Sequence, residues 1–351
     1  MTNPMAVRRQ AEQCARLTLL RLLCAVSVWR TVMTRILPLC GAAAWWTALI
    51  CLLPGLLTAA LLRLILHLTQ CSTLAEAARA CGGRLGAAIL CLSLTVLLTV
   101  EGISSVTALI TLFTEGVGTR GTQFSLAVLT GVFLLFSLHR EGLARAAFLM
   151  RWGLLAAFLV LIAAVLPSIQ LDSAFPLHGE GDASVQSGLS AGMSLGWPLA
   201  LLLTVPPTAG ERRLRSGILP VFLALGAVLL LTLTVPHERL VQSQELAECL
   251  LLPARYTGNA LRVLTLSLLM LSFFLSIGAA VQLATAQLLQ PWRSGPAWLP
   301  HALLAALVLT QTADIPLLWQ LLGRIEPWLL APLLGLGLLG LLSAMIRRNR
   351  I

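Results

Sequence analysis

The chain has 351 residues, of which 58% are hydrophobic and only 11% are charged, and its formal net charge is +10. A soluble domain carries about 25% charged residues, so this composition excludes a soluble globular protein and predicts a polytopic membrane protein. No long polar stretch separates the apolar runs, and we therefore expect one transmembrane domain over residues 1–351. All 24 basic residues are arginine, which excludes a Walker-type phosphate loop because that loop requires lysine.

The apolar runs predict an all-α protein with ten transmembrane helices. A hydrocarbon core of about 30 Å is crossed by roughly 20 apolar residues in a helix. Between the second and third spans, the segment TLAEAARACGGRLG (73–86) predicts a short surface helix that begins at a Ser/Thr cap and ends at Gly82 and Gly83. The ten spans are expected at 16–38, 42–68, 86–113, 122–138, 147–168, 186–206, 217–235, 260–289, 298–313 and 327–346.

The arginines indicate how these spans are threaded. Cytoplasmic loops retain positive charge. With the N-terminus inside, the inner segments hold 16 arginines and four acidic residues, whereas the outer segments hold five arginines and nine acidic residues. We therefore expect both termini in the cytoplasm and a multi-pass protein of the inner (cytoplasmic) membrane. Arg140, Arg145 and Arg151 form the cytoplasmic turn between spans four and five. The basic charge is thus a topology signal, and no nucleic-acid partner is expected.

Two charged residues lie deep inside predicted spans. Arg30 is near the middle of span one and Glu101 near the middle of span three, both roughly 20 Å from the inner ends at about 1.5 Å per residue. We expect them to meet as a buried pair, with Ser104 and Ser105 on the same helix face as Glu101. Ionisable groups in a membrane are costly and are candidates for function. The pair either binds substrate, with Glu101 taking an ammonium or a proton and Arg30 a carboxylate, or is a structural salt bridge.

Span six combines glycines and prolines. Gly188, Gly192 and Gly196 recur every four residues and are followed by Pro198. Such spacing permits close helix packing, and Gly with Pro also permits a broken helix whose ends bind substrate; both interpretations remain open. The substrate-binding candidates are Arg30, Glu101, Gly192, Gly196 and Pro198. In span eight, Ser267, Ser272 and Ser276 are expected to bond to neighbouring helices.

Neither an enzyme nor a metalloprotein is indicated. The GMSLG segment matches GxSxG with Ser194 as nucleophile, but that motif works at a strand-to-helix elbow with a histidine and an acid, whereas this one lies inside an apolar span. The eight cysteines contain no CxxC pair and the five histidines are scattered. We expect no catalytic residue, no metal site and no cofactor.

The landmarks in this order resemble the permease-like B subunit of bacterial spore germinant receptors, a branch of the amino acid–polyamine–organocation transporter superfamily. The resemblance covers nearly the whole chain, although span one lacks the glycines at which superfamily members unwind it and the Gly-Leu-Glu part of the segment before span five is poorly reproduced. The landmarks are Pro38 closing span one, Trp45–Trp46 opening span two, the linker with Thr73, Glu76, Gly82, Gly83 and Gly86, Ala144–Arg145 before span five, Pro176 before span six, and the basic tail from Arg347.

The resemblance implies a five-plus-five inverted repeat, with spans one and six at the centre and a ligand near the midplane. It implies a subunit that senses a small nutrient such as an amino acid in the inner spore membrane, beside an A-type membrane subunit and a lipoprotein C subunit. Two alternatives are an autonomous proton-coupled amino-acid permease and a scaffold that does not transport.

Overall fold

The structure, a computed structural model, describes most of six predicted spans. The described residues are 4–117, 181–193, 195–205, 213–234 and 259–289, with short pieces at 131, 142–143, 145–149, 152, 334–335, 338–340 and 342. Every regular element in these parts is a helix. Predicted spans four, five and nine, and most of span ten, lie outside the described residues, so the count of ten helices and the inverted repeat stay predictions.

Span one is a chain of helical pieces. Helix α1 (Pro4–Thr31) continues into a π-helical segment (Val32–Ile36), then α2 (Leu37–Cys40) and a 3-10 turn (Gly41–Ala43). The turn is possible because Gly41 adopts φ 52°, which a residue with a side chain rarely takes. Span two is the helix α3 (Ala44–Thr69), and α4 (Leu74–Val117) contains span three.

The predicted surface helix between spans two and three is confirmed. It is the first part of α4, which is broken at Gly83, where φ is 66° and ψ is −156°. Its start is a capping box: the backbone N–H of Glu76 donates to Thr73 Oγ1 at 3.3 Å, and Glu76 Oε2 accepts the backbone N–H of Thr73 at 3.2 Å. The Ser72 hydroxyl also donates to Glu76 Oε2 at 2.7 Å, and this bond lowers the pKa of the Glu76 carboxyl.

Span six is discontinuous, while spans seven and eight are regular. Helix α7 (Asp182–Gly192) ends before a turn, and α8 (Pro198–Leu201) then leads into a 3-10 turn (Leu202–Thr204). Helices α9 (Arg213–Thr234) and α12 (Asn259–Leu289) match the predicted spans 217–235 and 260–289 within a few residues.

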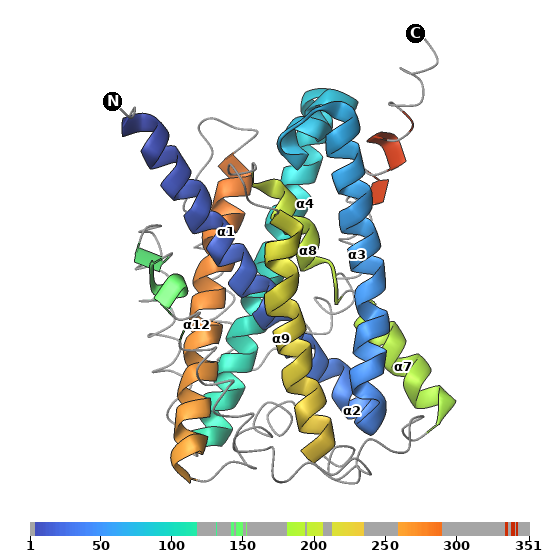
Figure 1. Ribbon diagram of the computed structural model, residues 1–351, viewed down its shortest axis with the longest axis vertical. Helices are drawn as coiled ribbons and strands as arrows, with labels where there is room; N and C mark the ends of the chain where they lie inside the picture. Colours follow the sequence, from blue (N-terminus) through green and yellow to red (C-terminus); the bar gives the residue numbers. More distant parts are fainter. Residues whose placement is uncertain are drawn as a thin grey trace.

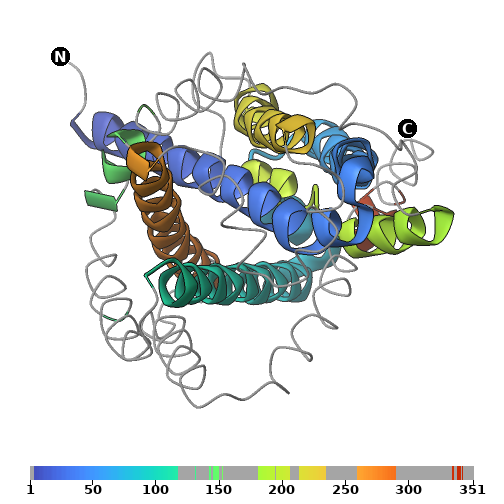
Figure 2. The same ribbon diagram turned by 90° about the horizontal axis from the view of Figure 1, so that it is seen from below.

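Helix α1 lies at the centre of the described helices. Seen along the bundle, it runs between the pair α3 and α9 on one side and the pair α4 and α12 on the other (Figure 2). Seen from the side, the start of α1 and the turn between α3 and α4 lie at one end, and α2, α7 and the start of α3 gather at the other (Figure 1). The threading expected from the arginines, including which end faces the cytoplasm, stays a prediction.

The surface of these helices is apolar, as a membrane requires. Three described stretches are long and apolar enough to cross a bilayer: Glu12–Thr69, which holds two spans, Leu74–Ile110 and Leu266–Gln287. Large apolar side chains are exposed on α3 and α4, among them Leu57 at 69% and Leu85 at 72%. Exposed apolar side chains on such helices are expected where they contact lipid. The chain is a multi-pass integral membrane protein.

Candidate functional site

Arg30 and Glu101 meet inside the bundle, as the sequence predicts. Arg30 Nη2 donates to Glu101 Oε2 at 2.9 Å, joining α1 to α4 across 71 positions of sequence. The two side chains are 5% and 2% exposed. An unpaired charge is very costly in such surroundings, and here each of the two residues has an oppositely charged partner.

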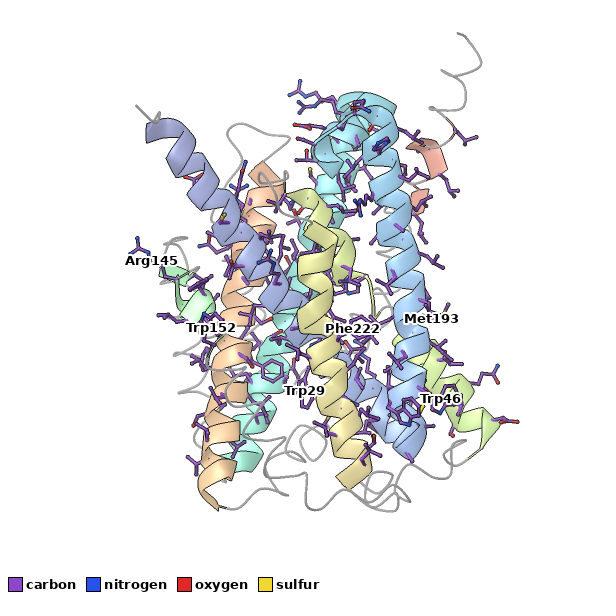
Figure 3. The ribbon with its side chains drawn as sticks, in the orientation of Figure 1. Trp29, Trp46, Arg145, Trp152, Met193 and Phe222 are labelled. Carbon is purple, nitrogen blue, oxygen red and sulfur yellow. The ribbon has the colours of Figure 1, made fainter. Side chains whose placement is uncertain are left out.

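The ion pair leaves polar atoms without partners. It consists of a single hydrogen bond, and Arg30 Nε and Glu101 Oε1 are buried with no hydrogen-bond partner among the described residues. The indole N–H of Trp29, which precedes Arg30 on α1 (Figure 3), is likewise buried with no hydrogen-bond partner among the described residues. Buried polar groups in native proteins are nearly always bonded. Two donors and one acceptor are therefore buried without a partner in this part of the chain.

Serines extend the polar region from Glu101 towards α12. Ser105 lies one turn beyond Glu101, and its Oγ is 3.4 Å from Ser276 Oγ, both side chains being buried. The prediction of interhelical bonding is thus confirmed for Ser276. It is wrong for Ser267 and Ser272, whose hydroxyls donate to the carbonyls of Val263 and Leu269 in their own helix, a bond that any helical serine can make without a neighbour.

Span one is distorted one turn after Arg30, although it lacks the expected glycines. The chain stays α-helical through Thr31, and the N–H of Leu37 then bonds to the carbonyl of Val32, a π-type bond. Pro38 has no N–H to offer the Thr34 carbonyl four residues earlier, which removes an α-helical bond at this point. Segments of π-helix are frequent at functional sites. Pro38 was the one sequence signal for this distortion, and it was interpreted only as the end of the span.

Span six is broken between Gly192 and Pro198. Residues 193 and 195–197 form a turn, in which the N–H of Leu195 donates to the Gly192 carbonyl at 2.8 Å. Met193, at the start of the turn, is 63% exposed (Figure 3). Pro198 begins α8, where a missing N–H costs nothing.

The span-six glycines also permit close packing, and the helix is interrupted here as well; that its ends bind substrate stays a prediction. A Cβ on Gly188 would overlap Cys40 Sγ, and one on Gly192 would lie 2.6 Å from Cys51 Sγ and 2.8 Å from Ile36 Cδ1. Since Ile36 belongs to the π-helical segment, the distorted part of span one and the end of α7 are in contact. Gly196 lies against the backbone of α3 at Gly55, with 2.7 Å from its Cβ position to the Gly55 Cα.

The five candidate site residues therefore fall into two groups. Arg30 and Glu101 are bonded to each other. Gly192 and Gly196 pack against α3, and the Pro198 carbonyl accepts the thiol of Cys24 from α1 at 3.1 Å. No hydrogen bond or ion pair joins the two groups within the part of the chain that the structure describes, and α1 is the element common to both.

The described helices give no support to a serine-nucleophile enzyme or to a metal site. Ser194, the nucleophile of the GxSxG interpretation, lies outside the described residues. The turn that follows Gly192 connects two helices, not a strand and a helix. Over the described ranges, no three of the residues Cys, His, Asp and Glu come together as metal ligands.

Comparison with known proteins identifies the fold. No protein-family model matches the chain, and no curated protein matches it. The chain is similar to the manganese transporter of Eremococcus coleocola: a histidine-to-alanine variant gives a TM-score of 0.54 at 14% identity, with 97% of this chain and 77% of that chain covered. The same transporter with an aromatic bis-isothiourea substituted compound gives 0.52 at 14%, covering 97% and 76%.

A glutamate-to-alanine variant of that transporter gives 0.52 at 16% identity, covering 97% and 77%. At such low identity the similarity shows the fold alone. The chain thus has a transporter-like fold.

Proposed function

We propose that this chain is the ligand-sensing membrane subunit of a spore germinant receptor, in which a transporter-like fold binds a small nutrient of the amino-acid class. The observation that carries the proposal is the contact between two interrupted spans. The π-helical part of span one packs on the end of α7, where span six breaks. Interrupted helices expose backbone groups that recognise ligands inside a membrane.

The charges favour a ligand with no net charge. Arg30 and Glu101 neutralise each other, so a net-charged ligand would leave one charge in excess at low dielectric. Arg30 Nε needs an acceptor and Glu101 Oε1 needs a donor. A zwitterionic amino acid supplies both, as a carboxylate and an ammonium group.

A metal cargo is a weaker candidate, although the transporter of similar fold is named for manganese. Divalent cations of this kind bind to carboxylate, carbonyl and water oxygens. Glu101 is a buried carboxylate, and the guanidinium group bonded to it repels a cation. We therefore propose an organic ligand and not a metal ion.

The proposed mechanism is a shift between two conformations. Ligand binding at the interruption would favour one arrangement of α7 and α8 relative to α1 and α3. An A-type membrane subunit and a lipoprotein C subunit would detect that arrangement. The shift can be no larger than the difference in ligand affinity between the two conformations.

A genetic experiment tests the receptor role. Deleting the gene for this chain from a spore-forming host should abolish germination in response to at least one L-amino acid, and the intact gene should restore it. The chain should also co-purify with the A-type and lipoprotein subunits. If germination with every L-amino acid is unchanged, the receptor role is wrong.

Two other functions have support of their own. The similarity to a transporter favours an autonomous proton-coupled amino-acid permease, which predicts uptake of labelled amino acid by proteoliposomes containing this chain alone. The regular α-helix through Arg30, where superfamily members unwind, favours a scaffold that does not transport. A scaffold predicts that alanine at Arg30, Glu101 and Gly192 leaves germination unchanged while the receptor still assembles.

A further inference from the structure

The surface helix at the start of α4 lies against the first turns of the span that follows it. The chain turns at Gly83, where φ is 66°. The Ala78 carbonyl oxygen lies 3.0 Å from the Cβ position of Gly86, so the two segments are in close contact. Arg79, the next residue, is near enough to Cys91 in the span for its charge to act on that thiol. The arginine is therefore held at the edge of the apolar part of α4.

Arginines make this end of the bundle, where α3 meets α4 (Figure 1), positive. Arg79 and Arg84, on either side of the turn, have exposed side chains, and so has Arg63 on α3. The one acidic residue in the sequence between the first and the last of them is Glu76. Its carboxylate is engaged at the start of the surface helix, where it accepts the hydroxyl of Ser72 at 2.7 Å. An anion that binds here meets an excess of positive charge.

An exposed apolar stripe on α4 begins where these arginines end. Its side chains recur every three or four residues, so they lie along one face of the helix. The members of this stripe are Leu85, Ile89, Leu92 and Val96. Positive charge that continues into an apolar stripe matches the chemistry of an anionic phospholipid, in which acyl chains follow a negatively charged headgroup.

The turn between the two arginines leaves room for a headgroup. Nothing lies within 4 Å of the Cβ position of Gly82 or of Gly83, and both residues are exposed. A guanidinium group binds a phosphate through two parallel N–H groups. An arginine side chain also lays its stem along apolar surface while its charged end reaches the polar region of the bilayer.

We propose that Arg79, Arg84 and the apolar stripe form a binding site for an anionic phospholipid, with its phosphate at the arginines and one acyl chain along α4. A soluble phosphate compound would contact the arginines but not the stripe, so the stripe favours a lipid. The bound lipid belongs to the leaflet that the arginine distribution assigns to the cytoplasm, whose surface is negative. This site is separate from the pair of Arg30 and Glu101 and does not depend on the proposed function.

Lipid binding to the purified full chain in a neutral detergent tests this inference. Native mass spectrometry should show tighter binding of dioleoylphosphatidylglycerol than of dioleoylphosphatidylcholine, which has no net charge. Arg79→Gln and Arg84→Gln should each weaken phosphatidylglycerol binding about fivefold, and together about 25-fold, the size expected for one and two arginines near anionic lipid. Phosphatidylglycerol should also slow amide exchange in peptides covering 74–86 of the wild type.

The matched control is Arg63→Gln. It removes the same charge at the same end of the bundle but from α3, and it should change phosphatidylglycerol binding by less than about twofold. All three arginine side chains are exposed, so each variant should unfold at the wild-type temperature when no lipid is present.

Three results would overturn the inference. The first is equal binding of the two lipids by the wild type. The second is a loss of binding in Arg63→Gln as large as that in Arg79→Gln, which would indicate a general effect of charge. The third is displacement of phosphatidylglycerol by glycerol phosphate, which has no acyl chain and would indicate a site for a soluble phosphate.

Discussion

The interruptions of spans one and six touch each other but are built in opposite ways. Span one stays helical, passing through a π-type turn in which the N–H of Leu37 still finds the carbonyl of Val32. Span six loses its helix between Gly192 and Pro198 and depends on contacts with other helices.

This difference in construction gives the two spans different roles at the site. Span one keeps its own backbone bonded and so holds Arg30 at a fixed position opposite Glu101. At its break span six keeps only bonds between residues three apart, such as that from the N–H of Leu195 to the Gly192 carbonyl, and its glycines pack closely on neighbouring helices. We infer that span one is the fixed side of the site and span six the side that rearranges.

The largest effect is expected from breaking the ion pair on the fixed side. Glu101→Gln leaves the buried Arg30 charge without a counter-charge, which should lower the free energy of unfolding by about 3–5 kcal/mol. Thermal unfolding of the purified chain measures this loss.

The matched control removes both charges. Arg30→Met with Glu101→Leu should unfold within about 1 kcal/mol of the wild type or above it, because replacing a buried ion pair by apolar residues is often neutral or stabilising. If Glu101→Gln destabilises the chain while its response to ligand is intact, the pair is structural only.

The next largest effect is expected on the side that rearranges. Gly192→Ala places a methyl group 2.6 Å from Cys51 Sγ and 2.8 Å from Ile36 Cδ1, which should cost about 1–3 kcal/mol of stability by overpacking. Gly82→Ala is the control, since nothing lies within 4 Å of its Cβ position. Equal unfolding temperatures for the two variants would show that α7 does not pack on α3 and the π-helical segment as described.

A substitution at the start of the surface helix, far from both interruptions, gives a reference for the size of these stability losses. Thr73→Ala removes the cap of the surface helix and should cost about 1 kcal/mol of stability.

The same helix start should also make stability depend on pH. Because hydrogen bonding lowers the pKa of Glu76, its carboxylate stabilises the fold at neutral pH. This contribution is lost as the pH falls through the folded-state pKa, which lies below the ordinary value of 4.5. Unfolding measured from pH 7 to pH 3.5 should show this loss in the wild type and not in Glu76→Gln.

The smallest effect is expected at the π-helical segment. Pro38→Ala restores an N–H that can reach the Thr34 carbonyl, so the segment should return towards α-helix with a net change below about 1 kcal/mol. Amide exchange over 32–37 should slow, and exchange at the break in span six should change with it because Ile36 contacts Gly192. Unchanged exchange over 32–37 would mean that Pro38 does not cause the distortion.

A contact between residues far apart in the sequence could be predicted where leaving either residue unpaired in the membrane would be costly. The meeting of Arg30 and Glu101 followed from their equal depth, because charges buried in lipid must pair. The surface helix followed from a local motif, Thr73 with Glu76, and from paired glycines. The extents of α3, α9 and α12 followed from the lengths of the apolar runs.

Features that depend on the register between helices were not predictable. Spacing showed that Gly188 and Gly192 permit close contact, but not that Cys40 and Cys51 are the side chains they contact. The bonds from the thiols of Cys24, Cys40 and Cys51 to carbonyls of span six carry no sequence signal, since a buried cysteine in an apolar helix is typical of a small hydrophobic residue. The π-type turn likewise arises from the absence of one N–H, a local detail that periodicity does not report.

The central claim is that the interrupted spans and the ion pair form a site for a neutral amino acid. Its most direct test is equilibrium binding of the twenty tritiated L-amino acids to the purified chain and to the Arg30→Met, Glu101→Leu double variant, which is expected to stay folded. The account predicts that the wild-type chain binds at least one of them saturably and that the double variant does not. Equal binding by a folded double variant would contradict it.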